Sequence, residues 1–366
     1  RCAGSAQQTG DWGQYMPVKT MVGEQPALSI HHPRIVITSR LNWVPLYRAL
    51  VAGLALLTIT LFVLALPYRL AELQVIAITT PAAHMQLTLA HALRLAHMGV
   101  SPAQYALVML TIESGLMLAF ALVSAVMLWH KGGDRFGLFI ALAAITYAGY
   151  ITPPLDSLLT LSSPLSWLSR ISQATGLWCA INFYYLFPDG RFTLRWTRAL
   201  AVVCALWCLS WVLHPIPRLH PSNPFGLTLP ALGIHLSWFV SGLVALWMRH
   251  RQTNDPVQRR QTKWVALSAV VVVVLYAFLY APPHIWPNLC GPGWCSFVFD
   301  LIIQPGYLAT LYVVPFSVLF AILRYRLWDV DLLLNRALVY GVLTAMLAGV
   351  YVMSVVGLPA LFPVLT

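Results

Sequence analysis

Long apolar runs separated by short polar connectors dominate the chain. A membrane-spanning helix needs about 20 mostly apolar residues, and the pattern predicts nine such segments. The connectors between them are short and rich in Pro, Gly and Arg. We therefore expect an all-α, polytopic membrane protein. Its nine expected helices cover residues 47–67, 103–129, 135–153, 168–187, 198–214, 231–249, 264–282, 302–323 and 338–361.

Two stretches do not fit the spanning pattern. Residues 1–45 are polar and predict a tail, so the multi-pass module is expected at 46–366. Residues 68–102 form the longest connector and are expected outside the membrane. Within them, leucines mixed with basic residues and histidines predict a short amphipathic helix at 81–100 on the outer membrane surface. These residues are Leu87, Leu89, Leu93 and Leu95, with His84, His91, Arg94 and His97.

Composition supports lipid as the solvent of this chain. Hydrophobic residues make up 59% and charged residues 9%, against about 25% charged residues in soluble proteins. Basic residues outnumber acidic ones by 22 to 11, which in a soluble protein would suggest nucleic acid. Here the excess matches the cytoplasmic loops of a membrane protein. We expect the bilayer as a partner and no nucleic acid.

The basic residues also predict an orientation. With nine helices, 17 Lys and Arg fall on one side of the membrane and 4 on the other. Since cytoplasmic loops are enriched in Lys and Arg, the N-terminus is expected in the cytoplasm, and the odd count places Thr366 outside. The chain begins at Arg1 and ends directly after an apolar run. We expect the chain to be a fragment of a longer reading frame.

Few residues offer chemistry inside the expected helices. Glu113 lies within the second helix, where an ionisable group is costly and suggests function. It could bind an amine, relay protons or pair with another helix, or it could be a protonated carboxyl bound to a neighbouring helix. Asn182, in the fourth helix, is a weaker candidate of the same kind for sensing a ligand.

Metal and cofactor chemistry is not expected. His84, His91 and His97 are too widely spaced to chelate one ion easily, so interfacial histidines on a wet helix face are favoured. No lysine lies inside an expected helix to carry retinal. A transmembrane haem pair needs histidines deep in facing helices, and only His235 enters an expected helix, near its end. Cys290 and Cys295 flank Gly-Pro-Gly-Trp in an outer loop, and they are either a disulfide or two free thiols.

Three cytoplasmic connectors carry dense turn and charge signals. The first, with Pro188, Asp189, Gly190 and Arg191, predicts a tight turn. In the second, Asp255 is expected to cap a helix that starts at Pro256 and to hold Arg259 and Lys263 at anionic lipid. The third places cations at one helix end and acids at the start of the next, as the helix dipole favours. Its residues are Arg324, Arg326, Trp328, Asp329, Asp331, Asn335 and Arg336.

These connectors carry a family resemblance. The runs Leu-Phe-Pro-Asp-Gly-Arg-Phe at 186–192, Asp-Pro-Val-Gln-Arg-Arg-Gln-Thr-Lys-Trp-Val at 255–265 and Ile-Leu-Arg-Tyr-Arg-Leu-Trp-Asp-Val-Asp at 322–331 follow in order. Asn335 to Gly341 extends the third, and Gly99-Val100-Ser101-Pro102 with Tyr105 precedes them. Over about residues 45–355 the chain resembles the N-terminal membrane region of bacterial sensor histidine kinases and their kinase-lacking relatives.

The resemblance implies a sensory and anchoring module in the bacterial inner membrane. It implies a homodimer, and a response regulator as partner only through an output domain that this chain lacks, because no phospho-acceptor His box or ATP-binding box occurs in it. The residues from Arg324 to Arg336 would be the signal-transmission junction. The alternatives are a small-molecule or lipid transporter, which would need a polar pathway or broken helices, and a membrane scaffold without a ligand.

Overall fold

The computed structural model describes residues 43–77, 84–161, 163–192, 194–213, 229–285 and 297–324. The chain divides into two compact units, Arg1–Leu41 and Asn42–Thr366, and every described residue lies in the second. The described part is helical, with one isolated β-bridge between Ala77 and Thr88. The expected tail at 1–45 therefore lies almost entirely outside the described residues.

The helices follow the expected order, with shifted boundaries. Eight of the nine expected segments fall on described helices, and 338–361 lies outside the described residues. The elements are α1 (Trp43–Gln74), α2 (Leu89–His97), α3 (Pro102–Lys131), α4 (Arg135–Ile151), α5 (Pro154–Ser157), η1 (Leu158–Thr160), α6 (Ser163–Leu186), α7 (Arg195–Leu213), α8 (Leu229–Gln252), α9 (Pro256–Ile285), η2 (Phe299–Ile303), α11 (Gln304–Thr310) and α12 (Val313–Arg324).

The prediction of nine spans is not confirmed. Among the described residues, six helical stretches are long and apolar enough to cross a membrane, or seven if α4 and the short helices after it, bent by 64°, form one span. Helix α6, the expected fourth span, is long enough but is not one of the six. Its polar side chains Ser169, Gln173 and Asn182 are buried. These polar residues lower the hydropathy of α6, and their burial means that they face other parts of the protein instead of lipid.

Local sequence signals explain where several helices begin. Ser101 and Gln104 form a capping box at the start of α3, whose first residue is Pro102. Asp134 caps α4 through a hydrogen bond from the Gly137 amide at 2.9 Å. Such caps satisfy amide groups that have no partner in the first helical turn.

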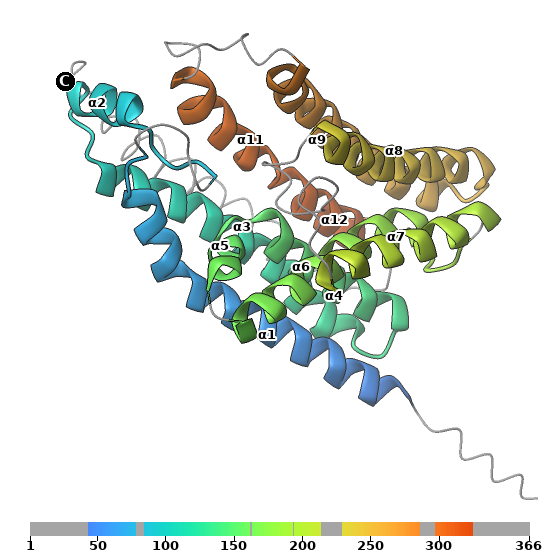
Figure 1. Ribbon diagram of the computed structural model, residues 1–366. Helices are drawn as coiled ribbons and strands as arrows, with labels where there is room; N and C mark the ends of the chain where they lie inside the picture. The colour runs from blue at the N-terminus through green and yellow to red at the C-terminus, as the bar shows by residue number, and fades with distance from the viewer. Residues whose placement is uncertain are drawn as a thin grey trace, which may run out of the picture. The chain divides into compact units, whose positions relative to one another are not determined.

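Helices α1, α3, α4 and α6 pack side by side, and α4 contacts the other three (Figure 1). Helix α6 also contacts α7 and α8, and α8 pairs with α9. The last elements, α11 and α12, each contact both α3 and α9. The final described segment therefore connects the first helices of the chain with the α8–α9 pair.

The expected eighth span, 302–323, lies largely within one helical stretch, Phe299–Ala321, that is irregular along its length, and we call it the interrupted span. It starts as the π-helix η2, continues as α11 with Pro305 in its first turn, and is interrupted at Leu311 and Tyr312 before α12. Single π-helical turns are frequent at functional sites. Leu311 and Tyr312 thus form a turn inside an otherwise helical stretch.

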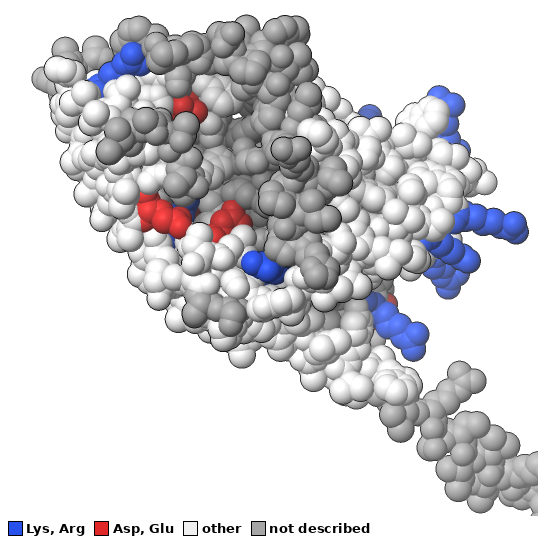
Figure 2. All heavy atoms as spheres, viewed as in Figure 1, with Lys and Arg blue, Asp and Glu red and all other residues white. Residues whose placement is uncertain are grey.

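Charge is distributed unevenly over the described unit. Figure 2 shows many Lys and Arg side chains projecting at one end, away from the acidic residues on the same face. We call this the basic end; it carries the connectors α3–α4, α6–α7 and α8–α9. The opposite end, which carries α2, is called the α2 end. Exposed bases of the basic end are Arg48, Arg135, Arg191, Arg195, Arg198, Arg251, Arg259, Arg260 and Lys263.

Candidate functional site

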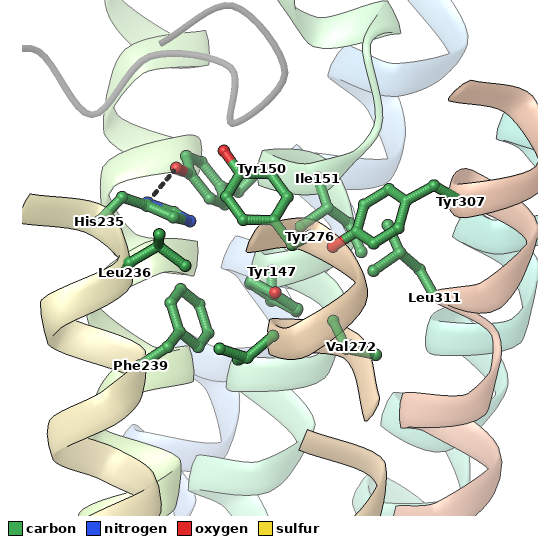
Figure 3. A pocket seen from close by; sticks show the side chains of 11 residues that line it. Tyr147, Tyr150, Ile151, His235, Leu236, Phe239, Val272, Tyr276, Tyr307 and Leu311 are labelled. Atoms are coloured by element: carbon green, nitrogen blue, oxygen red, sulfur yellow. Dashed lines mark hydrogen bonds between the residues drawn. The ribbon is translucent and has the colours of Figure 1, made fainter. Parts of the chain in front are cut away.

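A cavity lined by aromatic side chains lies between four helical elements (Figure 3). Its volume is about 30 Å³, which is room for about two water molecules. No Lys, Arg, Asp or Glu is among the eleven described residues that line it. They are Tyr147, Tyr150 and Ile151 of α4, His235, Leu236 and Phe239 of α8, Val272, Val273 and Tyr276 of α9, Tyr307 of α11, and Leu311.

His235 is the polar centre of this aromatic cavity. Its side chain is buried, and its Nδ1 lies 3.3 Å from the Tyr150 hydroxyl in a hydrogen bond (Figure 3). The His235 ring centroid is 5.0 Å from that of Phe239 and 5.8 Å from that of Tyr276. Tyr276 in turn lies 5.8 Å from Tyr307. The rings thus form a connected wall that joins α4, α8, α9 and α11.

The lining residues follow helical spacing, which explains why they share one cavity. His235 and Phe239 are four residues apart on α8, and Val272 and Tyr276 have the same spacing on α9. Residues four apart lie on one helix face. The sequence did not predict this site, because His235 stood out only as a histidine near the end of an expected helix. The recurrence of Tyr and His at spacings of three and four was the available signal.

The interrupted span links the cavity to α3. Tyr307 and Leu311 line the cavity, and the next residue, Tyr312, donates a hydrogen bond from its hydroxyl to the Ile112 carbonyl at 2.9 Å. Gly115 lies under the same hydroxyl, so close that a Cβ atom there would collide with it. The residue after the cavity-lining Leu311 therefore contacts α3 directly beside Glu113.

Glu113 is paired with another helix, one of the alternatives that the sequence left open. Its carboxylate accepts hydrogen bonds from Arg69 Nη2 at 2.8 Å and from Nε at 3.2 Å. Both side chains are buried, at 0% and 1% exposure. The expectation that Arg69 lies in an outer connector is wrong. Helix α1 continues through Pro67 to Gln74, and this places Arg69 inside the bundle.

Further contacts tie this ion pair to the α2 end. Arg69 Nη2 also donates to the His84 carbonyl at 2.9 Å, and Arg69 Nη1 lies 3.6 Å from Glu72. Glu72 accepts a hydrogen bond from Ser157 at 2.5 Å. Tyr105, part of the motif that begins α3, donates to the Met85 carbonyl at 2.9 Å. The pair therefore fixes α1, α3 and the start of the segment at residues 84–88.

The segment before α3 contains a short amphipathic helix, as expected, but this helix is shorter than predicted. Only Leu89–His97 is helical, as α2, and His91 and Leu95 are buried while Leu89 and Leu93 are exposed. The prediction of a wet histidine face is therefore wrong at His91, which lies 3.7 Å from Asp300 and against the ring of Phe297. The reason is that α2 packs on the segment that leads into η2.

Burial also changes the acid–base behaviour of two histidines in this segment. Burial and, to a lesser extent, the Arg69 guanidinium lower the pKa of His84 to about 3. Burial lowers the pKa of His91 too, although Asp300 opposes the effect. Both imidazoles are therefore neutral near pH 7. No group of three or more His, Cys, Asp or Glu side chains that could hold a metal ion occurs among the described residues.

The Pro-Asp-Gly turn is held by a buried arginine. Arg249, in the last turn of α8, pairs with Asp189 at 3.0 Å and donates to the carbonyls of Leu186, Phe187 and Arg191. Gly190 has φ +73°, and a Cβ there would lie 2.8 Å from Phe136. Pro188 is buried, and Arg191 is exposed. This turn thus locks α6 to α8 at the basic end.

The second connector begins its helix where the sequence predicts. Helix α9 begins at Pro256, and the Asp255 carboxylate accepts a hydrogen bond from the Val257 amide at 2.9 Å. Arg259 and Lys263 are exposed. Arg324 is the last residue of α12, and its side chain is not described. The junction residues Arg326, Trp328, Asp329, Asp331, Asn335 and Arg336 and the cysteines Cys290 and Cys295 lie outside the described residues.

Asn182 does not join Glu113 in a common site. Its amide nitrogen donates to the Trp178 carbonyl of the same helix at 2.8 Å. Neither residue lines the aromatic cavity. The structure therefore separates the two sensing candidates: Glu113 is bound by Arg69, whereas the Oδ1 atom of Asn182 is buried with no hydrogen-bond partner among the described residues.

Comparison of this chain with known protein-family models, with curated proteins and with solved structures finds no match in any of the three.

Proposed function

We propose that this chain is a membrane-embedded sensory module whose stimulus acts at the aromatic cavity. The observation that carries the proposal is the position of the cavity: it lies where α4, α8 and α9 meet the interrupted span, which contributes Tyr307 and Leu311. Ligand pockets are concave, mostly apolar, and contain a few polar groups that orient the ligand. His235 and the tyrosine hydroxyls are such groups.

The proposed response is a shift of the interrupted span. A ligand changes a conformational equilibrium only if it binds the two states differently. A molecule that contacts Tyr307 and Leu311 meets this condition if the two states differ in how α11 packs. The span continues through α12 to Arg324, where the predicted transmission junction begins. The Tyr312 contact with α3 would set the energy difference between the states.

In this proposal the bundle crosses the bacterial inner membrane with its basic end in the cytoplasm. The exposed cations of that end support this orientation by the positive-inside rule. Several tryptophans of the same end are exposed, among them Trp43, Trp129, Trp247 and Trp264, as is typical of the membrane interface. A reporter fused after Gln252 should be active in the cytoplasm, and periplasmic activity would contradict the orientation.

The kinase assignment rests on the sequence motifs alone. We propose that the chain belongs to the sensor histidine kinases or their kinase-lacking relatives, acts as a homodimer, and reaches a response regulator only through an output domain. The coding sequence after Thr366 tests this directly. A phospho-acceptor His box followed by an ATP-binding domain is expected, and an unrelated domain would contradict the kinase assignment.

A transporter is the second candidate, and the 64° bend between α4 and the short helices after it favours it. Discontinuous helices are typical of transport sites. However, the carboxylate expected to line a pathway, Glu113, is bound by Arg69, and Glu113 and Asn182 do not share the described cavity. We therefore retain the sensory module as the proposed function.

Filling the cavity tests the sensory proposal without knowledge of the ligand. Val272 lines the cavity, whereas Val274 on the same helix is 57% exposed. The variants Val272→Phe and Val274→Phe are compared in lipid nanodiscs by hydrogen exchange with mass spectrometry. Val272→Phe should change amide protection in peptides covering residues 299–336, and Val274→Phe should not. Equal protection in both variants would refute a cavity that controls this span.

A further inference from the structure

We propose that the aromatic cavity is a cage for a small organic cation of the primary alkylammonium class. The inference deepens the proposed function, since it names the ligand class of the same cavity. It is carried by the aromatic faces that surround the space, by the absence of charged side chains from the described lining, and by the charge of the end at which the cavity lies.

The rings provide the attraction. Tyr147, Tyr150, Phe239, Tyr276 and Tyr307 line the cavity together with His235. Neighbouring ring centroids are 5.0 to 6.1 Å apart. A cation within about 6 Å of a ring centroid is attracted by the negative face of the ring. An ion at the centre of this cluster would contact several rings at once, while an anion would find no cationic side chain in the described lining.

The polar groups of the lining fit the hydrogens of an ammonium group. Tyrosine hydroxyls accept hydrogen bonds through their oxygen atoms, and the lining contains four of them. Hydrogen bonds to a charged donor are stronger than those between neutral groups. A primary ammonium would therefore replace part of its hydration by tyrosine oxygens and place its alkyl group against Val272, Val273 and Leu311.

The size of the cavity selects a small ion. A volume of about 30 Å³ holds about two waters. Methylammonium, with two heavy atoms, fits this space without a change of the walls. A quaternary ammonium ion is larger and would require the interrupted span to move outward. The class is therefore limited to ammonium ions with one short alkyl group.

The electrostatic environment guides such an ion to the α2 end. His235 lies near the first residue of α8 and Tyr150 near the last residue of α4, so the cavity is nearer the α2 end than the basic end. With Glu113 paired to Arg69, the described α2 end carries three acids, Glu72, Asp156 and Asp300, against Arg94 and Arg170. Exposed cations gather at the opposite end (Figure 2). Such a distribution concentrates cations where acids predominate.

The test uses methylammonium chloride and its uncharged isostere methanol as probes. The full chain in nanodiscs is titrated at constant ionic strength, and saturation-transfer NMR follows the methyl protons of each probe. Saturable binding of methylammonium at concentrations where methanol shows none is the expected result. Methanol binding equally well would overturn the cation class, and so would the absence of saturable methylammonium binding.

Two substitutions separate attraction by the ring from hydrogen bonding. Tyr276→Phe keeps the aromatic face and should retain binding within about threefold, whereas Tyr276→Leu should weaken it by about tenfold. Unchanged affinity in folded Tyr276→Leu would contradict the cage. If that variant does not fold, Tyr307→Leu takes its place, and the comparison of the two probes on the unsubstituted chain remains decisive. The hydrogen-exchange test with Val272→Phe needs no ligand, so the ligand class can fail while the sensory proposal stands.

Discussion

Replacement of Glu113 by Gln tests whether this carboxylate is a structural partner of Arg69. Gln has nearly the same shape, so it removes the negative charge and leaves the packing almost unchanged. Arg69 would then keep its hydrogen bond to the His84 carbonyl, and its nearest remaining carboxylate would be Glu72 at 3.6 Å. We expect Glu113→Gln to destabilise the folded chain strongly.

The magnitude follows from the geometry of the pair. At 2.8 Å and an effective dielectric constant of about 20, the direct attraction is about 6 kcal/mol. Removing one partner of a buried pair typically costs about 3–5 kcal/mol, because the other charge stays buried. Glu72 offers partial compensation, so we expect about 3 kcal/mol for Glu113→Gln. Replacing both partners, as in Arg69→Met with Glu113→Leu, should cost less than either single change.

Equilibrium unfolding in mixed micelles measures these free energies, and a double-mutant cycle isolates the coupling between the two residues. Glu72→Gln is the matched control, because Glu72 is partly exposed and its loss should cost under about 1 kcal/mol. If Glu113→Gln were as stable as the unsubstituted chain, the ion pair would not be a structural element. Glu113 would then be a candidate for proton or ligand chemistry again.

Three further predictions concern other contacts. Gly115→Ala should cost about 1–3 kcal/mol of unfolding free energy because its Cβ meets the Tyr312 hydroxyl; adding Tyr312→Phe should restore most of it, and Gly53→Ala, with open space around it, is the control. Arg249→Ala should cost about 3 kcal/mol of unfolding free energy, because it leaves Asp189 and three carbonyls without this partner. Arg251 is exposed, so the control Arg251→Ala should cost less than about 0.5 kcal/mol. Equal losses of unfolding free energy in the two variants would refute the role of Arg249 in holding α6 to α8. The folded-state pKa of His84, about 3, lies below its ordinary value of 6.5, so the unfolded chain binds the proton more readily and stability falls by about 1.4 kcal/mol per pH unit below about pH 6.5. Unfolding measured from pH 7 to 4 should show a weaker pH dependence in His84→Gln than in the exposed control His97→Gln.

The sequence predicted the helices better than their contacts. Apolar runs of spanning length are a direct consequence of lipid as solvent, so the segments and their order could be predicted. The break at Leu311 and Tyr312 was only hinted at by Pro305 and Gly306, because a turn within an apolar run leaves no change in hydropathy. The lower hydropathy of α6 was likewise overlooked, since burial against other helices replaces lipid contact.

The candidate site depended on information that one-dimensional patterns lack. Glu113 stood out because a buried carboxylate is costly, but its partner Arg69 seemed to lie in a connector, because the first expected helix ended at residue 67. Pro67 lies inside α1. The aromatic cavity combines residues from four elements up to 160 positions apart, Tyr147 to Tyr307. Only the three-dimensional packing brings these rings together.

The most direct test of the central claim is the output of the full-length protein in membranes when its cavity is filled. We expect Val272→Phe to fix the output in one state, so that it differs several-fold from that of the unsubstituted protein and no longer responds to the stimulus. Val274→Phe should behave like the unsubstituted protein. If Val272→Phe and Val274→Phe gave the same output and the same response, the aromatic cavity would not be the site at which this chain receives its signal.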